Sequence, residues 1–222
     1  MASWTRNISG LLNIFLQSNC PLCDRPTAQE LCLDCTRQIQ RCRLSAHSIS
    51  QQKLPIFVWG NYGGTLKRAI ASLKYDNQTQ LARPLGTWLG QAWLKSQLAQ
   101  PGLIVVPIPL HINKQKQRGY NQALLIAQSF CEVTGLRWQH GLERRRDTKA
   151  QFNLSAAGRE QNLAMAFDLS SKFRLHQPTD RVLLLDDIYT TGATARFAAQ
   201  TLQQQGIAVY GMVAIATSQR QN

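Results

Sequence analysis

The sequence has little acidic charge and no long apolar run. Among 222 residues, 12 are Asp or Glu and 25 are Lys or Arg, so the formal net charge is +13. This excess predicts an anionic partner, and charge alone does not select among nucleic acid, acidic lipid and phosphorylated metabolite. The apolar stretch 8–16 is short and broken by Ser9, Gly10 and Asn13, which argues against a bilayer-spanning helix or a strong export signal there. We therefore expect a cytoplasmic chain without a transmembrane segment.

Histidine is scarce, and cysteine is almost confined to one short segment. The four histidines share no spacing typical of metal ligands, whereas five of the six cysteines fall between residues 20 and 42. Two Cys-x-x-Cys pairs, Cys20 with Cys23 and Cys32 with Cys35, are separated by eight residues. Four thiolates in such pairs suit tetrahedral Zn2+, so we predict one structural zinc ion. Paired disulfides are the alternative, which the lack of an export signal disfavours.

Composition places the chain among globular proteins with one sizeable core. Hydrophobic residues make up 44% of the sequence, enough at this length for one substantial domain and a small appendage. We predict an N-terminal helix and zinc-binding module with a linker in residues 1–50, and a larger domain in residues 51–222. The Ser- and Gln-rich stretch 45–53 is the expected linker.

Strands and helices alternate through the larger domain. The pattern predicts strands at 56–62, 103–106, 182–185 and 207–217. Helices are predicted after Gly64, at about 85–98, at 120–134 and at 193–205, the last two ended by glycine. This alternation predicts an α/β fold with a mostly parallel sheet. Trp88 and Trp93 occupy apolar helical positions and are expected in the core.

The segment 182–194 combines a buried strand, two carboxylates and a turn that opens a helix. The candidate ligand-binding residues contribute side chains or, at the glycine and alanine, backbone amide groups. They are Asp186, Asp187, Thr190, Thr191, Gly192, Ala193 and Thr194. Amide groups at a helix start, together with threonine hydroxyls, suit a phosphate monoester. The aspartates suit sugar hydroxyls, or Mg2+ held directly or through water. A sugar phosphate would suit both the aspartates and the threonine-containing turn. The alternative is a capped helix after two turn-forming aspartates.

Basic residues gather at two places in the larger domain. The first group follows the strand that ends at Pro107, and the second lies within residues 137–149; their members are Lys114, Lys116 and Arg118, then Arg144, Arg145 and Arg146. Ligands of open α/β sheets bind beyond the carboxyl ends of the strands, so the first group and the aspartates can face one crevice. There the cations would meet a pyrophosphate or DNA phosphates. Solvated surface loops are the alternative for both groups.

The segment 182–194 resembles the phosphoribosyl pyrophosphate motif of type I phosphoribosyltransferases. The order of the cysteine pairs, Pro107-x-Pro109, the run from Arg118 to Gln122 and the ribosyl motif resembles the ComF family over nearly the whole chain. Further matching positions are Thr148, Gln151, Arg159, Asn162 and Phe167. The resemblance implies a zinc-bearing module on a type I phosphoribosyltransferase-like domain that handles single-stranded DNA in competent bacteria. It also implies Mg2+ with phosphoribosyl pyrophosphate as ligand, and proteins of the DNA-uptake machinery as partners.

Three functions are compatible with these features. The first is a competence protein that binds single-stranded DNA and keeps a sugar-phosphate pocket. The second is a metabolic phosphoribosyltransferase that transfers ribose 5-phosphate to a nitrogenous base and releases pyrophosphate, for which Mg2+ and preorganised cations would serve. The third is a regulator that senses the sugar phosphate. The sequence names no catalytic residue and no acceptor base.

Overall fold

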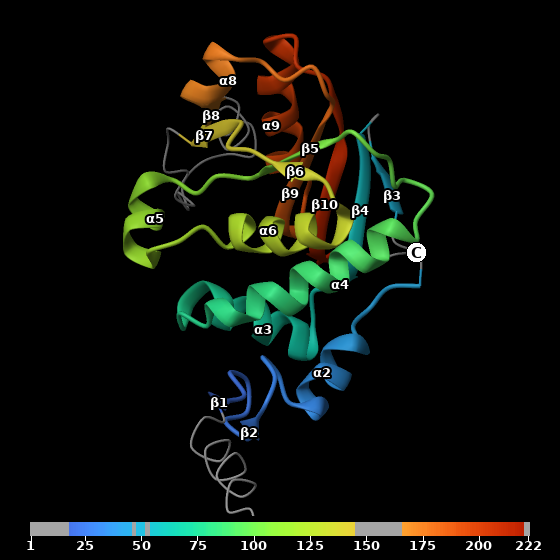
Figure 1. Ribbon diagram of the computed structural model, residues 1–222, viewed down its shortest axis with the longest axis vertical. Coiled ribbons are helices and arrows are strands. Elements are labelled where there is room, and N and C mark those ends of the chain that lie inside the picture. The colour runs from blue at the N-terminus through green and yellow to red at the C-terminus, as the bar shows by residue number, and fades with distance from the viewer. Residues whose placement is uncertain (1–17, 46–47, 52–53, 145–165, 220–222) are drawn as a thin grey trace, which may run out of the picture.

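The computed structural model describes residues 18–45, 48–51, 54–144 and 166–219, and its centre is a six-stranded sheet (Figure 1). In spatial order the strands are β3 (Ser48–Gln51), β4 (Leu54–Asn61), β10 (Val209–Thr217), β9 (Val182–Tyr189), β5 (Ile104–Pro107) and β6 (Arg137–Trp138). All neighbours from β4 to β6 pair in parallel, and in this sheet β3 alone is antiparallel to its neighbour. The predicted α/β class with a mostly parallel sheet is confirmed.

Helices cover both faces of the sheet. One face carries α3 (Gly64–Tyr75), α4 (Ala82–Leu94) and α6 (Gln122–Thr134), and the other carries α9 (Ala193–Gln204) (Figure 1). Side chains of β9 alternate between two apolar clusters: Leu183 and Leu185 pack toward the first face, and Val182 and Leu184 toward the second. This burial on both faces explains the unbroken apolar run that begins the strand.

Shorter elements complete the described fold. They are β1 (Ser18–Asn19), β2 (Pro26–Thr27), α2 (Leu33–Gln40), the 3-10 turn η1 (Thr79–Leu81), α5 (Ile112–Arg118), β7 (Leu142–Arg144), β8 (Phe167–Leu169) and α8 (Ser171–Leu175). The helix α5 was not predicted. Its ends are nevertheless set by local chemistry, because the His111 side chain accepts the Asn113 N–H and Gly119 closes the helix with a φ of 84°.

Several predicted boundaries need correction. The expected linker contains β3, whose Ser48–Gln51 backbone pairs with β4. The strand predicted to end at residue 185 continues through both aspartates to Tyr189, because β10 pairs with it as far as Thr217. The helix predicted to reach residue 98 ends at Leu94. The expected N-terminal helix lies outside the described residues.

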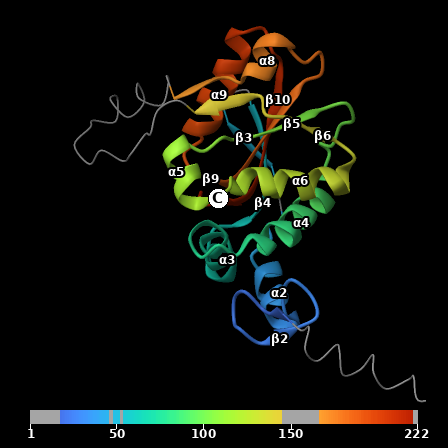
Figure 2. The same ribbon diagram turned by 60° about the vertical axis from the view of Figure 1, so that its left-hand side comes forward.

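The cysteine module, residues 18–45, packs directly on the larger domain. Leu31 and Ile39 belong to the same buried apolar cluster as Leu66 and Leu85. The backbone continues this contact, since the Leu44 N–H donates to the Trp59 carbonyl at 3.0 Å. Both views place α3 and α4 between α2 and the sheet (Figures 1 and 2). The position of a domain boundary near residue 50 stays a prediction.

Aromatic side chains fill the first face of the sheet. Trp93 is 2% exposed and meets Phe57 edge to face, with ring centroids 5.5 Å apart. Trp88 stacks on Trp59 at 5.8 Å. Trp93 therefore lies in the core as predicted, whereas Trp88 is partly buried and packs against the core. Among the described residues, no helix has the length and apolar character needed to cross a membrane.

Candidate functional site

The aspartates and the glycine turn, residues Thr190–Thr194, lie at the carboxyl end of β9. Thr190 and Thr191 are exposed, and Gly192 has a φ of 79°, in the left-handed region that favours glycine. The Thr191 hydroxyl accepts the Ala193 N–H at 3.4 Å, and α9 begins at Ala193. Amide groups at the start of this 12-residue helix therefore border an accessible turn, as an anion site requires.

Asp187 is buried in a polar network that crosses three elements. Its Oδ2 pairs with the Lys74 ammonium at the end of α3, and its Oδ1 accepts from Gln122 Nε2 of α6 at 3.0 Å. Burial alone would raise the pKa of Asp187, but the Lys74 charge and the hydrogen bonds outweigh it and lower that pKa. The pKa of Lys74 is raised, because attraction to Asp187 exceeds the effect of its own burial. Asp187 is therefore an ionised carboxylate with its own resident cation.

Asp186 is the more accessible member of the pair. It is partly exposed, and its Oδ1 accepts the backbone N–H of Asp187 at 2.8 Å. Its pKa is raised well above the usual range, first by desolvation and then by the neighbouring Asp187 charge. The two adjacent carboxyl groups therefore differ in character: one is ionised and paired, and the other retains its proton more readily.

A cleft of about 720 Å3 lies between the end of α3 and α5. We call it the basic cleft; its lining residues are Lys74, Tyr75, Asn77, Lys114, Lys116, Gln117, Arg118, Gly119 and Tyr120. The structure thus brings together all three cations of the first predicted group and adds Lys74. The Arg118 guanidinium lies 5.5 Å from the Tyr75 ring centroid and donates to Gln122 Oε1. Because Gln122 also holds Asp187, the cleft and the aspartates share one hydrogen-bonded network.

The second predicted basic group lies largely outside the described residues. Arg145 and Arg146 fall there, as do Thr148, Gln151, Arg159 and Asn162. Arg144 is described: its backbone forms a bridge with that of His111, the residue before α5, and its guanidinium lies 5.5 Å from the Phe167 ring. The start of the second group therefore lies next to the segment that carries the first.

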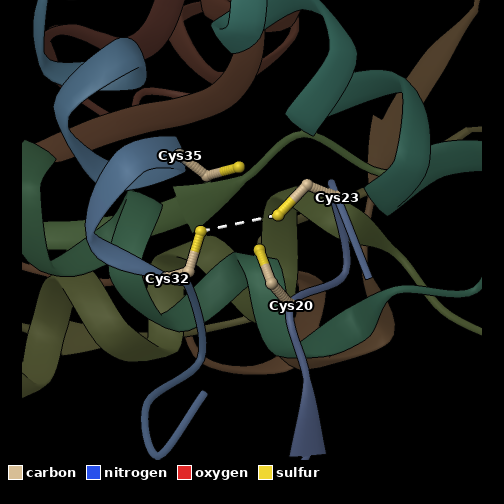
Figure 3. A group of neighbouring side chains, drawn as sticks. All are labelled: Cys20, Cys23, Cys32 and Cys35. Carbon is tan, nitrogen blue, oxygen red and sulfur yellow. Dashed lines mark hydrogen bonds between the residues drawn. The ribbon is translucent and has the colours of Figure 1, made fainter. Parts of the chain in front are cut away.

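The two Cys-x-x-Cys pairs meet in space, and we call them the cysteine cluster (Figure 3). All four Sγ atoms lie within 4.8 Å of one another, and those of Cys23 and Cys32 are 3.5 Å apart. A tetrahedral zinc ion with bonds of about 2.3 Å separates its sulfur ligands by roughly 3.8 Å. The predicted four residues therefore have the arrangement that a metal ion such as zinc needs.

The thiols of the cluster differ in acidity: burial and the neighbouring thiols raise the pKa of Cys35, whereas that of Cys20 is lowered. Burial alone would raise the pKa of Cys20, but backbone N–H groups of Cys32, Leu22 and Cys23 and the Cys23 thiol lower it to about 7. Outside the cluster, an ion pair of 2.5 Å between Arg25 and Asp34 ties the two pairs together. The remaining cysteines do not join the cluster: Cys42 lies against Gly63, and Cys131 is buried on α6.

Sequence reasoning missed Lys74. A signal was present, because Lys74 lies four residues after Ile70 and so falls on the apolar face of α3. A charged residue on a buried helix face needs a partner of opposite charge. Its identity could not be read from the sequence, since Asp187 lies on a strand far along the chain.

The fold and the two sites define an α/β protein with a parallel sheet, a basic cleft at its strand ends and a four-cysteine module. The chain is 35% identical over 153 residues to Competence protein F of Haemophilus influenzae, covering 67% of this chain and 66% of that one. It is 30% identical over 198 residues to the DNA utilization protein YhgH of Salmonella typhimurium, covering 86% and 80%. Competence protein ComFC of Bacillus subtilis is 26% identical over 188 residues, covering 84% and 72%. The chain belongs to the ComF family of competence and DNA utilization proteins.

Solved structures with partial overlap were also found. Glutamine phosphoribosylpyrophosphate amidotransferase from B. subtilis aligns with a TM-score of 0.42 and 18% identity, covering 66% of this chain and 30% of that one. Adenine phosphoribosyltransferase from Leishmania donovani aligns with a TM-score of 0.41 and 13% identity, covering 77% and 74%. No family model matches the chain.

Proposed function

We propose that this protein handles single-stranded DNA during DNA uptake in natural transformation, and that the basic cleft holds the DNA phosphates. The observation that carries this proposal is the gathering of Lys74, Lys114, Lys116 and Arg118 around one cleft. The net charge of +13 and the names of the relatives support the same role. Exposed lysines and a guanidinium bind phosphates without reading sequence, as incoming DNA of any sequence requires.

The salt dependence of binding tests this proposal. A footprint that neutralises about four phosphates gives a slope of roughly −3 in a plot of log affinity against log salt, because each contact on a single strand contributes about 0.7. Changing Lys114, Lys116 and Arg118 together to Gln should flatten the slope by about two units for every sequence. The matched control changes three exposed cations outside the cleft lining: Lys95, Lys172 and Arg181.

Two outcomes would contradict the proposal. One is binding that does not change between low and physiological salt. The other is an equal loss of slope in the cleft variant and its control, which would mean that the net charge and not the cleft attracts the DNA. Arg144, Arg145 and Arg146 are the second proposed contact, and their change to Gln extends the same series.

A sugar-phosphate pocket is the second part of the proposal. We propose that Thr190 to Thr194 bind the 5′-phosphate of phosphoribosyl pyrophosphate or a related ligand, that Asp186 meets the sugar hydroxyls, and that Mg2+ accompanies the diphosphate. The exposed turn at the start of α9, next to the aspartates, supports this assignment. Thermal unfolding with phosphoribosyl pyrophosphate and Mg2+ is the test, since a ligand at 100 times its Kd adds about 2.7 kcal/mol of stability. An unchanged melting temperature would count against the pocket.

We also propose that the cysteine cluster holds one structural Zn2+. Four sulfur ligands leave no open coordination position, so the ion would fold the module and take no part in chemistry. Elemental analysis of protein purified without chelator should give one zinc per chain. A chain without zinc would end this proposal.

A metabolic phosphoribosyltransferase is the alternative that the aspartates and the glycine turn favour. Such an enzyme would release pyrophosphate from phosphoribosyl pyrophosphate when a purine, pyrimidine or nicotinate acceptor is supplied. Release with one of these acceptors would favour the enzyme over the DNA-handling role. Binding without release would leave the DNA-handling protein or a sugar-phosphate-sensing regulator, which the salt series separates.

A further inference from the structure

Lys74 lies at the junction of the basic cleft and the aspartate pair. Its ammonium pairs with Asp187 Oδ2, and the same residue lines the cleft. The Lys74 side chain is 17% exposed and the Asp187 side chain 4% exposed. The lysine therefore reaches solvent on the cleft side, whereas the carboxylate is nearly closed off behind it.

Groups of this chain contact both carboxylate oxygens of Asp187. Gln122 Nε2 donates to Asp187 Oδ1, and Arg118 occupies Gln122 Oε1, which fixes the amide with its N–H toward Asp187. One carboxylate oxygen thus accepts a hydrogen bond, and the other is ion-paired with the Lys74 ammonium. Mg2+ requires near-octahedral coordination by oxygen atoms and keeps several of its waters. It could reach Asp187 only after displacing the Lys74 ammonium, so these residues do not fit a magnesium site at Asp187.

Charge balance explains why the lysine is there. A buried carboxylate without a cation is strongly unfavourable, and a bound divalent ion is one way to neutralise it. Here a single ammonium of the chain already neutralises Asp187. An anion in the cleft would meet that same ammonium from its exposed side.

We propose that Lys74 is the built-in counter-ion of Asp187, that it takes the place of a divalent cation there, and that it presents the same charge to the anion bound in the basic cleft. The part about the bound anion rests on the proposed function. Any Mg2+ that arrives with a diphosphate would stay on the oxygens of the ligand. Lys74 would thus position the anion against the aspartate pair without a metal bridge.

Manganese binding tests the counter-ion without any anion. Mn2+ is a hard ion that prefers oxygen ligands, so it should leave a thiolate-bound zinc in place while electron paramagnetic resonance counts bound and free ion. We expect no stoichiometric Mn2+ on the wild-type, zinc-loaded protein. Lys74→Met should gain one Mn2+ with an affinity at least about tenfold above background, and Lys74→Met with Asp187→Asn should lose it. Lys67→Met is the matched control, because Lys67 is exposed on the same helix.

Two results would overturn the proposal. The first is one Mn2+ bound to the wild-type protein and lost in Asp187→Asn, which needs no lysine variant and therefore decides the matter even if Lys74→Met does not fold. The second is a folded Lys74→Met protein that gains no Mn2+. If the variant does not fold, an empty wild-type protein supports the proposal, and the charge-preserving Lys74→Arg should remain equally empty.

Inorganic pyrophosphate tests the second role of Lys74. In buffer without added divalent ion, the wild-type protein should bind pyrophosphate, and Lys74→Met should bind it about tenfold or more weakly while Lys67→Met is unchanged. Equal binding by Lys74→Met would remove this role. If the wild-type protein binds pyrophosphate neither with nor without Mg2+, the proposed anion site fails, and the manganese series still decides whether Lys74 is the counter-ion.

Discussion

The cysteine cluster draws its ligands from residues 20–35, whereas the site at the sheet end draws on α3, α5, α6 and β9, between residues 74 and 194. A backbone turn places Cys20 and Cys23, with the Asp24 N–H bound to the Cys20 carbonyl at 2.8 Å, and the start of α2 places Cys32 and Cys35. The aspartate network instead depends on the packing of helices against the sheet, since Lys74 and Gln122 reach Asp187 from different helices. The cysteine cluster is therefore specified by the spacing of its residues in the sequence, whereas the aspartate network is specified by the fold.

The two regions nevertheless share an apolar boundary. Ile39 of α2 is fully buried in the apolar cluster that also contains Leu66 and Leu73 of α3. The Thr65 hydroxyl at the start of α3 donates to the Gln38 side chain at 2.8 Å, while Lys74 lies near the other end of the helix. A single helix thus borders both sites, and experiments that disturb one site report how far the other depends on it.

Removing the proposed zinc ion should have the largest effect and tests whether the regions are separable. Structural zinc contributes about 10–16 kcal/mol to folding in isolated zinc-finger peptides, so a chelator or Cys32→Ser should unfold the cysteine module. Hydrogen exchange should then show lost protection in α2 and retained protection in β9 and β10. Cys42→Ser, in the same module but outside the cluster, is the control. Loss of protection in β9 as well would mean that the shared apolar boundary makes both regions one folding unit.

The glycine turn tests how strongly the fold constrains the sheet-end site. Gly192 and Gly206 have φ values of 79° and 77°, so alanine is strained at both, by about 1–2 kcal/mol. A Cβ at residue 192 would lie 2.5 Å from the Tyr189 hydroxyl, whereas a Cβ at residue 206 would meet no atom within 4 Å. Overpacking adds about 1–3 kcal/mol, so Gly192→Ala should be the more destabilising of the two in urea unfolding.

Tyr189→Phe provides the internal check on this prediction. In the Gly192→Ala background the loss of the hydroxyl removes the 2.5 Å contact and leaves Tyr189 ring carbons at 3.1 and 3.3 Å, so the two changes together should be less destabilising than the sum of their separate effects. Strict additivity, or equal losses for Gly192→Ala and Gly206→Ala, would show that Tyr189 does not restrict the turn.

Much of the fold and part of each site follow from local sequence. The spacing of the Cys-x-x-Cys pairs predicts the cysteine cluster, and the apolar run followed by Gly192 predicts the strand and the start of α9. The strand β3 escaped prediction because its Ser- and Gln-rich sequence has no apolar alternation, and its pairing depends on β4. Lys74 escaped because an ion pair between a helix and a distant strand leaves no spacing to read. The DNA-facing role of the basic groups stays a prediction.

The smallest change in stability is expected for Asp186→Asn, through a pH dependence that distinguishes the two aspartates. The pKa of Asp186 is raised in the folded protein by burial and by the Asp187 charge. The stability that its protonated form contributes is complete below the unfolded pKa of about 3.9 and is lost as pH rises toward the folded pKa. Asp186→Asn removes this loss, so the melting temperature of the variant should rise relative to that of the wild-type protein as pH increases from about 4 toward the folded pKa of Asp186. The cysteine cluster is common to both proteins, so its own pH dependence cancels in the difference.

Asp187 should give the opposite slope, at lower pH. Its pKa is lowered chiefly by Lys74, against the effect of burial, so the stability that it contributes is present above about pH 4 and is lost as pH falls through the folded pKa. The stability of Asp187→Asn should therefore be furthest below that of the wild-type protein above pH 4 and should approach it in acid. Because one partner of a buried ion pair is removed, the gap at neutral pH should be about 3–5 kcal/mol. Parallel curves for the two variants would mean that the carboxyl groups titrate alike, and that the fold does not give them the separate roles that their surroundings indicate.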